Sequence, residues 1–384
     1  MARERSIETR AVHAGKPATS IEGAVVMPIF QTAMYETVSD EDYHDIRYLR
    51  LNNSPNHLLI HDKLASLESA EAGLVTASGM AAISTALLTF LGAGDHMLAQ
   101  DVLYGGTHSM ILHDFPKLGI EVDFIDGADP ESWGAKLKPN TKAIYVETIS
   151  NPLIGVPELK AVPEFAKANN LVSLIDNTFA SPVNFRPAEH GYDLALHSAT
   201  KYLNGHTDIV AGAVVGRAGL VEQVRHKLNH LGGSLDPHAC FLLNRGLVTL
   251  PLRIARQNDS ALRIARFLDG HPAVSRVNYA GLVSSPHHER AKAALDGFGG
   301  MLSFDLAGGA DAARRLLDRA TIPMIAPSLG GVETLLTLPA ATSHQSISPE
   351  DRAALGIGDG LVRMSVGIES PDDLIDDLGS ALDA

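Results

Sequence analysis

One lysine that follows two hydroxyl side chains is the clearest candidate for chemistry in this sequence. Lys201 lies in the segment 197–208, follows Ser198 and Thr200, and comes soon after a short apolar run that is typical of a strand end. A lysine amine can form a Schiff base with an aldehyde, and neighbouring hydroxyls can bind a phosphate. A lone lysine in a loop is more often simply exposed. The segment by itself therefore leaves both interpretations open.

A carboxylate and a helix start upstream could complete such a site. Asp176 ends the strand predicted at 172–176, and α/β proteins bind ligands at the carboxyl ends of parallel strands. A negative charge there favours the protonated form of a pyridine nitrogen. The turn Ser78-Gly79-Met80 begins a predicted helix, and the free N–H groups of a helix start can bind a phosphate. Taken alone, that turn is also an ordinary helix start.

These motifs together resemble the Cys/Met-metabolism family of pyridoxal-phosphate enzymes, which includes cystathionine γ-lyase, cystathionine γ-synthase and methionine γ-lyase. The resemblance runs from about Val12 to Glu369, nearly the whole chain. It implies the α/β fold of type I pyridoxal-phosphate enzymes, with a mostly parallel mixed sheet in a large domain and a smaller α+β C-terminal domain. It also implies that pyridoxal 5′-phosphate is the cofactor, bound covalently by Lys201.

The resemblance also implies the cofactor contacts. Asp176 would hold the pyridine nitrogen, and Tyr104 would stack on the ring and pass a proton to the leaving group. Asn151 would hydrogen-bond the phenolic oxygen and lie beside the substrate. The residues matched to the phosphate site are Ser78, Gly79, Met80, Ser198 and Thr200. Without the resemblance, each of these positions would be interpreted as a turn.

Two matched residues in the C-terminal region concern the substrate. Arg363 corresponds to the arginine that clamps the α-carboxylate, for which a bidentate guanidinium fixes both charge and orientation. Ser328 corresponds to a loop serine beside that carboxylate. From the residues alone, Arg363 could be a solvated strand end and Ser328 a turn residue.

Strand-like and helical runs alternate through the middle of the chain, which predicts a doubly wound, mostly parallel sheet. After about residue 250, helices alternate with short strands, as expected of a small α+β domain. The short apolar runs of the middle region lie at 97–100, 122–125, 143–146 and 171–175. We therefore expect an N-terminal arm at 1–55, a large cofactor-binding domain at 56–250 and a small domain at 251–384.

The N-terminal arm is polar and irregular except for an apolar island at 27–32. Such a segment cannot bury itself, so it is either disordered or packed on a neighbour. The resemblance implies the neighbour, because Tyr48 and Arg50 match a Tyr-x-Arg motif that reaches the partner's cofactor phosphate. It implies a homotetramer, a dimer of dimers with shared active sites. Residues 51–56 depart from the usual family pattern, which leaves the shape of this loop open.

Charge and cysteine content exclude several other classes of protein. A formal net charge of −14 opposes binding to nucleic acid or to anionic membranes, and no apolar run reaches the ~20 residues of a membrane span. The single cysteine, Cys240, excludes an intrachain disulfide and favours a reducing compartment. The adjacent His287 and His288 do not share a helix face, so no metal site is predicted. We expect a soluble, cytoplasmic protein.

Two positions bear on the choice of reaction. Pro327 stands where cystathionine-specific members often carry a glutamate, and Gly106 stands where methionine γ-lyases often carry a cysteine. We therefore expect a carbon–sulfur γ-lyase of cystathionine γ-lyase type with broad tolerance for sulfur amino acids, which releases a thiol, a 2-oxo acid and ammonia. Cystathionine γ-synthase is the close alternative, followed by methionine γ-lyase and by a non-catalytic cofactor-binding regulator.

Overall fold

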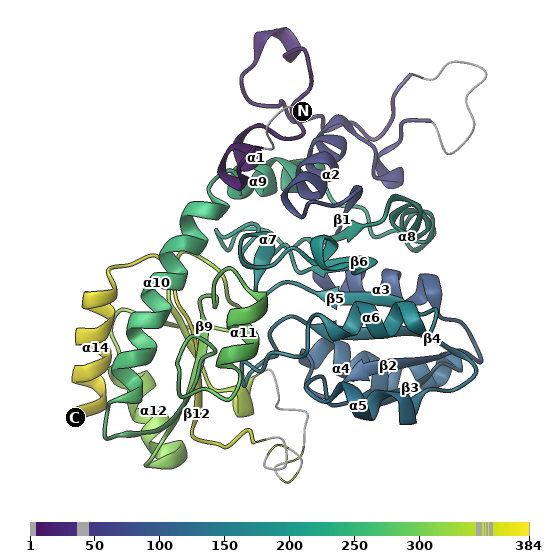
Figure 1. Ribbon diagram of the computed structural model, residues 1–384. Helices are drawn as coiled ribbons and strands as arrows, with labels where there is room; N and C mark the ends of the chain where they lie inside the picture. The colour runs from purple at the N-terminus through teal and green to yellow at the C-terminus, as the bar shows by residue number, and fades with distance from the viewer. Residues whose placement is uncertain are drawn as a thin grey trace.

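The chain forms two β-sheets flanked by helices (Figure 1). The structure is a computed structural model that describes residues 5–36, 46–342, 348, 350, 352 and 356–383. Among these residues, no helix combines the length and apolar character needed to cross a membrane.

The larger sheet has seven strands in the order β1-β7-β6-β5-β4-β2-β3. From β6 to β3 the neighbours are parallel, whereas β7 is antiparallel to both β1 and β6. This arrangement confirms the mostly parallel mixed sheet expected from the sequence. The strands are β1 (Ala72–Thr76), β2 (His96–Gln100), β3 (Glu121–Ile125), β4 (Thr141–Glu147), β5 (Val172–Asp176), β6 (Leu194–His197) and β7 (Gly212–Gly216).

Helices cover both faces of this sheet, and each face has its own apolar core. Along β4, Ile144 and Val146 enter one core, while Ala143 and Tyr145 enter the other, because successive side chains of a strand alternate between faces. Burial on both faces explains why these strands are continuous apolar runs. The first core includes α2 (Pro55–Leu67), α6 (Ala161–Ala168) and α9 (Pro237–Val248), and the second includes α3 (Gly79–Phe90), α4 (Gly105–His113) and α8 (Ala218–Leu231).

The second sheet has five strands in the order β10-β11-β12-β9-β8 and a core of its own. The long helix α10 (Leu250–Asp269) leads from α9 to this sheet (Figure 1), and we propose the domain boundary at its start. The remaining elements are α5 (Pro130–Trp133), α7 (Ser181–Asn184), β8 (Val274–Asn278), α11 (His288–Ala294), β9 (Met301–Leu306), α12 (Gly309–Arg319), β10 (Met324–Ile325), β11 (Leu335–Thr337), β12 (Leu361–Ser365) and α14 (Pro371–Asp383).

The N-terminal segment is more ordered than the sequence predicted. Helix α1 (Ile7–His13) lies against α2, α9 and α10, so the expectation of a wholly irregular arm is wrong for these residues. Gly15 follows with φ +75°, and a Cβ there would lie 2.1 Å from the Leu59 carbonyl oxygen, so the position requires glycine.

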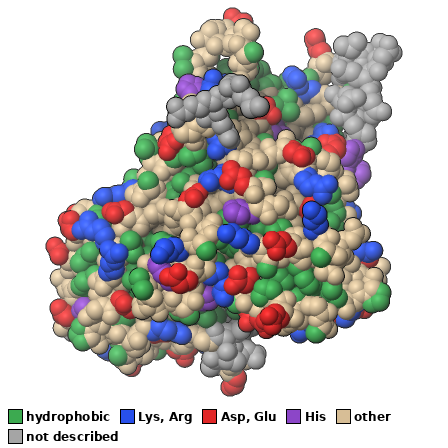
Figure 2. Space-filling view, viewed as in Figure 1, with side chains coloured by type: hydrophobic (Ala, Val, Ile, Leu, Met, Phe, Trp, Pro, Cys, Tyr) green, Lys and Arg blue, Asp and Glu red, His purple; other side chains and the backbone are tan. Residues whose placement is uncertain are grey.

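Beyond α1, large apolar side chains of this segment lie on the surface. Val25 is 84% exposed and Met34 is 73% exposed. Elsewhere, on the face shown in Figure 2, acidic and basic side chains are interspersed. The predicted contact of the segment with a neighbouring subunit stays a prediction.

Candidate active site

A cavity of about 630 Å³ lies where the strand ends of the larger sheet meet loops of the C-terminal region. Glu147, Asp176 and Ser198 reach it from the ends of β4, β5 and β6, which is where parallel sheets bind ligands. The residues predicted from the sequence that line this cavity are Ser78, Gly79, Met80, Tyr104, Asn151, Asp176, Ser198, Thr200, Lys201, Ser328 and Arg363.

The start of α3 forms one wall of the cavity. Ser78 caps the helix, since its Oγ accepts the Ala81 N–H at 3.0 Å. A Cβ at Gly79 would lie 2.7 Å from Ser198 Cβ, so only glycine lets the helix start approach the segment that precedes Lys201. Backbone N–H groups of a first helical turn beside a serine hydroxyl suit a phosphate.

Thr200 is held more firmly than the sequence indicated. Its Oγ1 donates to the Ala211 carbonyl at 3.1 Å and accepts the Ala211 N–H at 3.0 Å. The hydroxyl hydrogen therefore ties the lysine-bearing segment to the residue before β7. Thr200 lines the cavity, and its direct contact with a phosphate stays a prediction.

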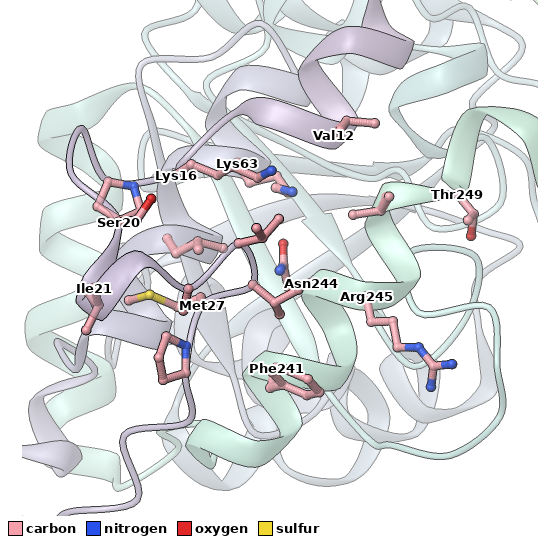
Figure 3. Close-up of a pocket in the computed structure, with 17 residues that line it drawn as sticks. Val12, Lys16, Ser20, Ile21, Met27, Lys63, Phe241, Asn244, Arg245 and Thr249 are labelled. Carbon is pink, nitrogen blue, oxygen red and sulfur yellow. The ribbon is translucent and has the colours of Figure 1, made fainter.

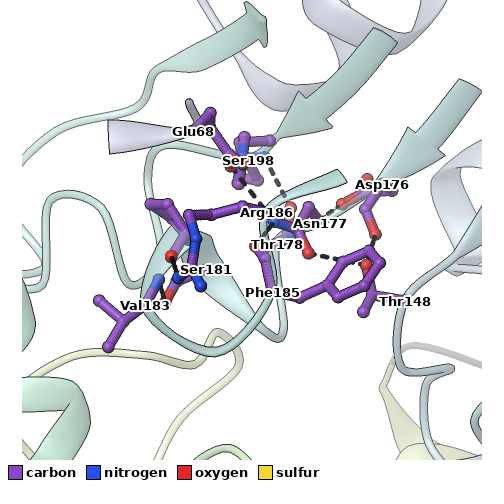
Figure 4. Close-up of polar contacts among 12 residues, drawn as sticks. Glu68, Thr148, Asp176, Asn177, Thr178, Ser181, Val183, Phe185, Arg186 and Ser198 are labelled. Atoms are coloured by element: carbon purple, nitrogen blue, oxygen red, sulfur yellow. Dashed lines mark hydrogen bonds and ion pairs between the residues drawn. The ribbon is translucent and has the colours of Figure 1, made fainter. Parts of the chain in front are cut away.

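Asp176 is a buried carboxylate anchored to both neighbouring segments. Its Oδ1 accepts the Thr178 N–H at 2.9 Å, and Thr178 Oγ1 accepts the Ser198 N–H at 2.8 Å (Figure 4). Burial raises the pKa of Asp176, while the Thr178 hydrogen bonds and the nearby His197 lower it. A buried anion is costly unless a cation lies beside it. Asp176 therefore suits a protonated pyridine nitrogen.

Lys201, Ser328 and Arg363 form one connected group. Lys201 Nζ donates to Ser328 Oγ at 2.7 Å, and Arg363 Nη2 donates to the Ser328 carbonyl at 3.0 Å. Arg363 Nη1 donates to Asn151 Oδ1 at 2.9 Å. Ser328 adopts φ +105°, a conformation rare for a residue with a side chain. Such strain is common at functional sites.

The cavity changes the acidity of the lysine. Burial, followed by the positive charge of Arg363, lowers the pKa of Lys201 to about 8. Arg363 is 6% exposed, and burial lowers its pKa to about 10, so it is a cation at neutral pH. A deprotonated amine beside a fixed guanidinium can react with a carbonyl and can accept a proton.

We expect the rate at which the apoprotein binds its cofactor to depend on pH through the pKa of Lys201. The second-order rate with pyridoxal 5′-phosphate should rise as pH increases towards about 8 and level off above it, because only the neutral amine attacks an aldehyde. Stopped-flow absorbance at the visible edge measures the rate. A rate independent of pH between about 6.5 and 9 would show that Lys201 is not the titrating nucleophile.

Tyr104 lies at the mouth of the cavity with 45% of its surface exposed. A Cβ at Gly106 would lie 2.6 Å from the Tyr104 ring, so a larger residue at position 106 would displace this ring. The Tyr104 N–H donates to Glu147 Oε1 at 2.6 Å. Sequence reasoning missed Glu147. The signal was a carboxylate at the end of a buried strand, the same pattern that identified Asp176.

Tyr48 and Arg50 do not line the cavity of their own chain. Arg50 Nη1 donates to the Asn229 carbonyl at 2.8 Å, and its guanidinium carbon lies 5.7 Å from the centre of the Tyr48 ring. Because the prediction places these residues in a partner's site, a single chain does not test it.

A second cavity, of about 510 Å³, lies between the N-terminal segment and α9 (Figure 3). Its walls are mostly apolar, and they include Lys63, whose Nζ donates to the Ala11 carbonyl at 2.7 Å. That carbonyl belongs to the last turn of α1, so the lysine satisfies a helix end. None of the residues predicted for the active site lines this cavity.

The comparisons with known proteins agree with this geometry. The family model of Cys/Met metabolism PLP-dependent enzymes matches residues 8–383. The chain belongs to this family. Its cofactor is therefore pyridoxal 5′-phosphate, and the α3 start, Asp176 and Lys201 offer groups that suit the phosphate, the ring nitrogen and the aldehyde.

Relatives with different activities are almost equally similar to the chain. A cystathionine gamma-lyase of Bacillus subtilis is 41% identical, and the match covers 98% of this chain and 99% of the relative. An L-methionine gamma-lyase of Fusobacterium nucleatum is 39% identical, with 99% of both chains covered. A cystathionine beta-lyase of Bacillus subtilis is 40% identical, with 98% of this chain and 96% of the relative covered. Overall identity therefore leaves the type of reaction open.

The fold is also that of a solved member of the family. The structure of cystathionine gamma-lyase from Lactobacillus plantarum complexed with L-serine has a TM-score of 0.94 to this chain and 35% identity, with 99% of both chains covered. The type I fold expected from the sequence is confirmed, and the chain is a PLP-dependent enzyme.

Proposed function

We propose that this enzyme is a carbon–sulfur γ-lyase of cystathionine γ-lyase type. The observation that carries the proposal is the link from Lys201 through Ser328 to Arg363. The Lys201 amine and the buried Arg363 cation bond the same serine, which supports their proposed roles as nucleophile and carboxylate clamp, in a cavity whose other wall suits the cofactor. An α-amino acid is the substrate class that needs both groups at this spacing.

In this proposal each side chain of the site has a separate role. Bound pyridoxal 5′-phosphate supplies a ring that withdraws electrons from the substrate Cα. Arg363 binds the α-carboxylate and fixes the orientation of the Cα–H bond. Lys201 Nζ, with its pKa lowered to about 8, removes the Cα proton and returns protons to the carbon chain. The Tyr104 hydroxyl donates a proton to the departing sulfur.

The substrate's side chain would meet a mostly apolar part of the cavity. Ile149, Phe179, Val210, Pro327 and Leu329 line it. At position 327 a proline offers no charge to select a distal amino group, and apolar walls accept thioethers of different length. We therefore propose broad activity on cystathionine, methionine and homocysteine.

The first experiment is a spectrum and product assay on the purified holoenzyme. We expect an absorbance band near the visible edge that shifts when L-cystathionine or L-methionine is added, with release of 2-oxobutyrate and ammonia. Pyruvate from cystathionine would indicate cleavage on the β side instead. Product only from O-succinyl-L-homoserine with cysteine would support cystathionine γ-synthase. Activity on cystathionine far above that on methionine and homocysteine would contradict the broad tolerance.

We propose that the active form is a homotetramer built from dimers with shared sites, located in the cytoplasm. The exposed apolar side chains of the N-terminal segment, including Val25 and Met34, favour burial by another copy. The buried Cys240 suits a reducing compartment. A monomer that binds its cofactor normally would contradict the shared site.

A further inference from the structure

Two buried carboxylates lie side by side in the wall of the active-site cavity. Glu147 ends β4 and Asp176 ends β5, and the two residues are register partners in the parallel pair. Partners in register point to the same face of a sheet. Both line the cavity, and they are 4% and 9% exposed. Asp176 is proposed to hold the ring nitrogen, whereas Glu147 has no part in the proposed reaction.

Glu147 also connects the end of β4 to the loop that carries Tyr104. Its Oε1 accepts the Tyr104 N–H at 2.6 Å, and the nearby Asn151 backbone N–H helps to lower its pKa. Tyr104 follows β2 and Glu147 ends β4, so this hydrogen bond helps to fix the spacing of two separate strand ends. The N–H of Glu147 itself donates to Gln100 Oε1 at 3.1 Å, at the end of β2.

The two carboxylates have no cationic side chain paired with them among the described residues. In that part of the chain, neither Glu147 nor Asp176 forms a salt bridge. Burial, and then the charge of Asp176, raises the pKa of Glu147 well above its usual range, while the two backbone N–H groups lower it. The other ionisable groups facing this pair are Tyr145 on β4, His197 on β6, and Tyr104, Lys201 and Arg363 around the cavity.

We propose that Glu147 is a positioning residue of the active site. It holds the Tyr104 loop against the end of β4, and its negative charge adds to that of Asp176 in favouring a cationic cofactor. The inference rests on the proposed assignment of Asp176 to the ring nitrogen. Two carboxylates that repel each other in the apoprotein would gain a shared cation when the cofactor binds.

Two substitutions of Glu147 separate the role of its charge from the role of its side-chain length. Glu147→Gln keeps an oxygen for the Tyr104 N–H but removes the charge, and Glu147→Asp keeps the charge but shortens the side chain. For the Gln variant we expect a cofactor dissociation constant about tenfold higher, comparable to the loss in metal affinity when residues that support metal ligands are removed. The midpoint of the visible band in a pH titration of the holoenzyme should fall, because the cationic form loses a favourable charge. For the Asp variant we expect that midpoint to be kept while kcat falls.

The apoprotein supplies a readout that needs no activity. A carboxylate whose pKa is raised on folding makes the protein less stable as pH rises above the pKa of the unfolded chain, near 4. Between about pH 5 and 8, the Tm of apo Glu147→Gln should therefore fall less than that of the wild type. Glu121→Gln, a change at a 57% exposed carboxylate on β3, is the matched control and should behave as the wild type.

The titration and the melting curves use no substrate, so they remain informative if the enzyme proves to have another reaction. An unchanged dissociation constant and an unchanged midpoint in Glu147→Gln would overturn the proposal. If the Gln variant does not fold, the Asp variant gives the test: loss of the wild-type midpoint with kcat intact would overturn it equally.

Discussion

Replacing Lys201 with alanine should reduce turnover by at least about 10⁴-fold, since a covalent catalyst and proton acceptor is lost in one step. The visible band should disappear, while Asp176 and the α3 start still hold the cofactor noncovalently. Release of 2-oxo acid per mole of holoenzyme, together with the spectrum, measures both effects. Turnover within tenfold of the wild type would exclude Lys201 as the nucleophile.

A second buried lysine offers a matched control for this change. Lys63 is 1% exposed, and its pKa is lowered to about 8, chiefly by burial. Because it contacts α1 and lies away from the active-site cavity, Lys63→Met should keep its turnover per folded molecule. Burial and low pKa alone would then be insufficient to make a lysine catalytic.

Lys201→Ala also tests whether two subunits share an active site. Lys201→Ala and Arg50→Ala are each expected to be poorly active, but a mixture that is unfolded and refolded together forms hybrid dimers. Each hybrid would contain one site with both residues intact, so about a quarter of the wild-type activity should return. No recovery, despite hybrid formation shown by mass spectrometry, would place Arg50 outside the partner's site.

Replacing Arg363 with alanine should lower kcat/KM by about 10²- to 10³-fold, mainly through KM, because the substrate carboxylate loses its charge-assisted contacts. Steady-state assays with L-methionine and with its amide separate the effects. The acid should lose most of its advantage over the amide in the variant.

Arg363→Lys is the control, because it keeps the positive charge but removes the planar guanidinium group. It should recover only part of the lost kcat/KM, since a lysine cannot donate to Asn151 and Ser328 while also holding a carboxylate. Equal losses for acid and amide in both variants would show that Arg363 supports the fold rather than the substrate.

The strands and the residues at their ends were predictable because they obey local rules. Asp176 and Lys201 follow buried apolar runs, and the parallel sheet then brings such ends together. Glu147 obeys the same rule, but its role depends on the Tyr104 N–H that it accepts, a contact that only the fold reveals. Helix α1 was missed because a helix of seven residues depends on its packing against α2, α9 and α10 rather than on its own sequence.

Contacts between distant segments lay outside the reach of the sequence. Nothing near Ser328 indicates that its hydroxyl accepts the Lys201 amine, or that its backbone takes φ +105°. The close approach of Gly79 to Ser198 is likewise a product of tertiary packing. Local patterns predict elements and their ends, whereas the angles and distances within the cavity arise from the packing of the two sheets.

Because Ser328 bonds both the lysine and the arginine, we expect binding at Arg363 and binding at Lys201 to be coupled. A carboxylate that draws Arg363 away from the Ser328 carbonyl changes the group that holds the Lys201 amine. Such coupling is reciprocal: the factor by which a carboxylate at Arg363 changes the affinity of Lys201 for the aldehyde is also the factor by which the bound aldehyde changes the affinity of Arg363 for the carboxylate. We therefore expect the carboxylate of an amino acid substrate, bound at Arg363, to influence the reactivity of the lysine that its amine must displace.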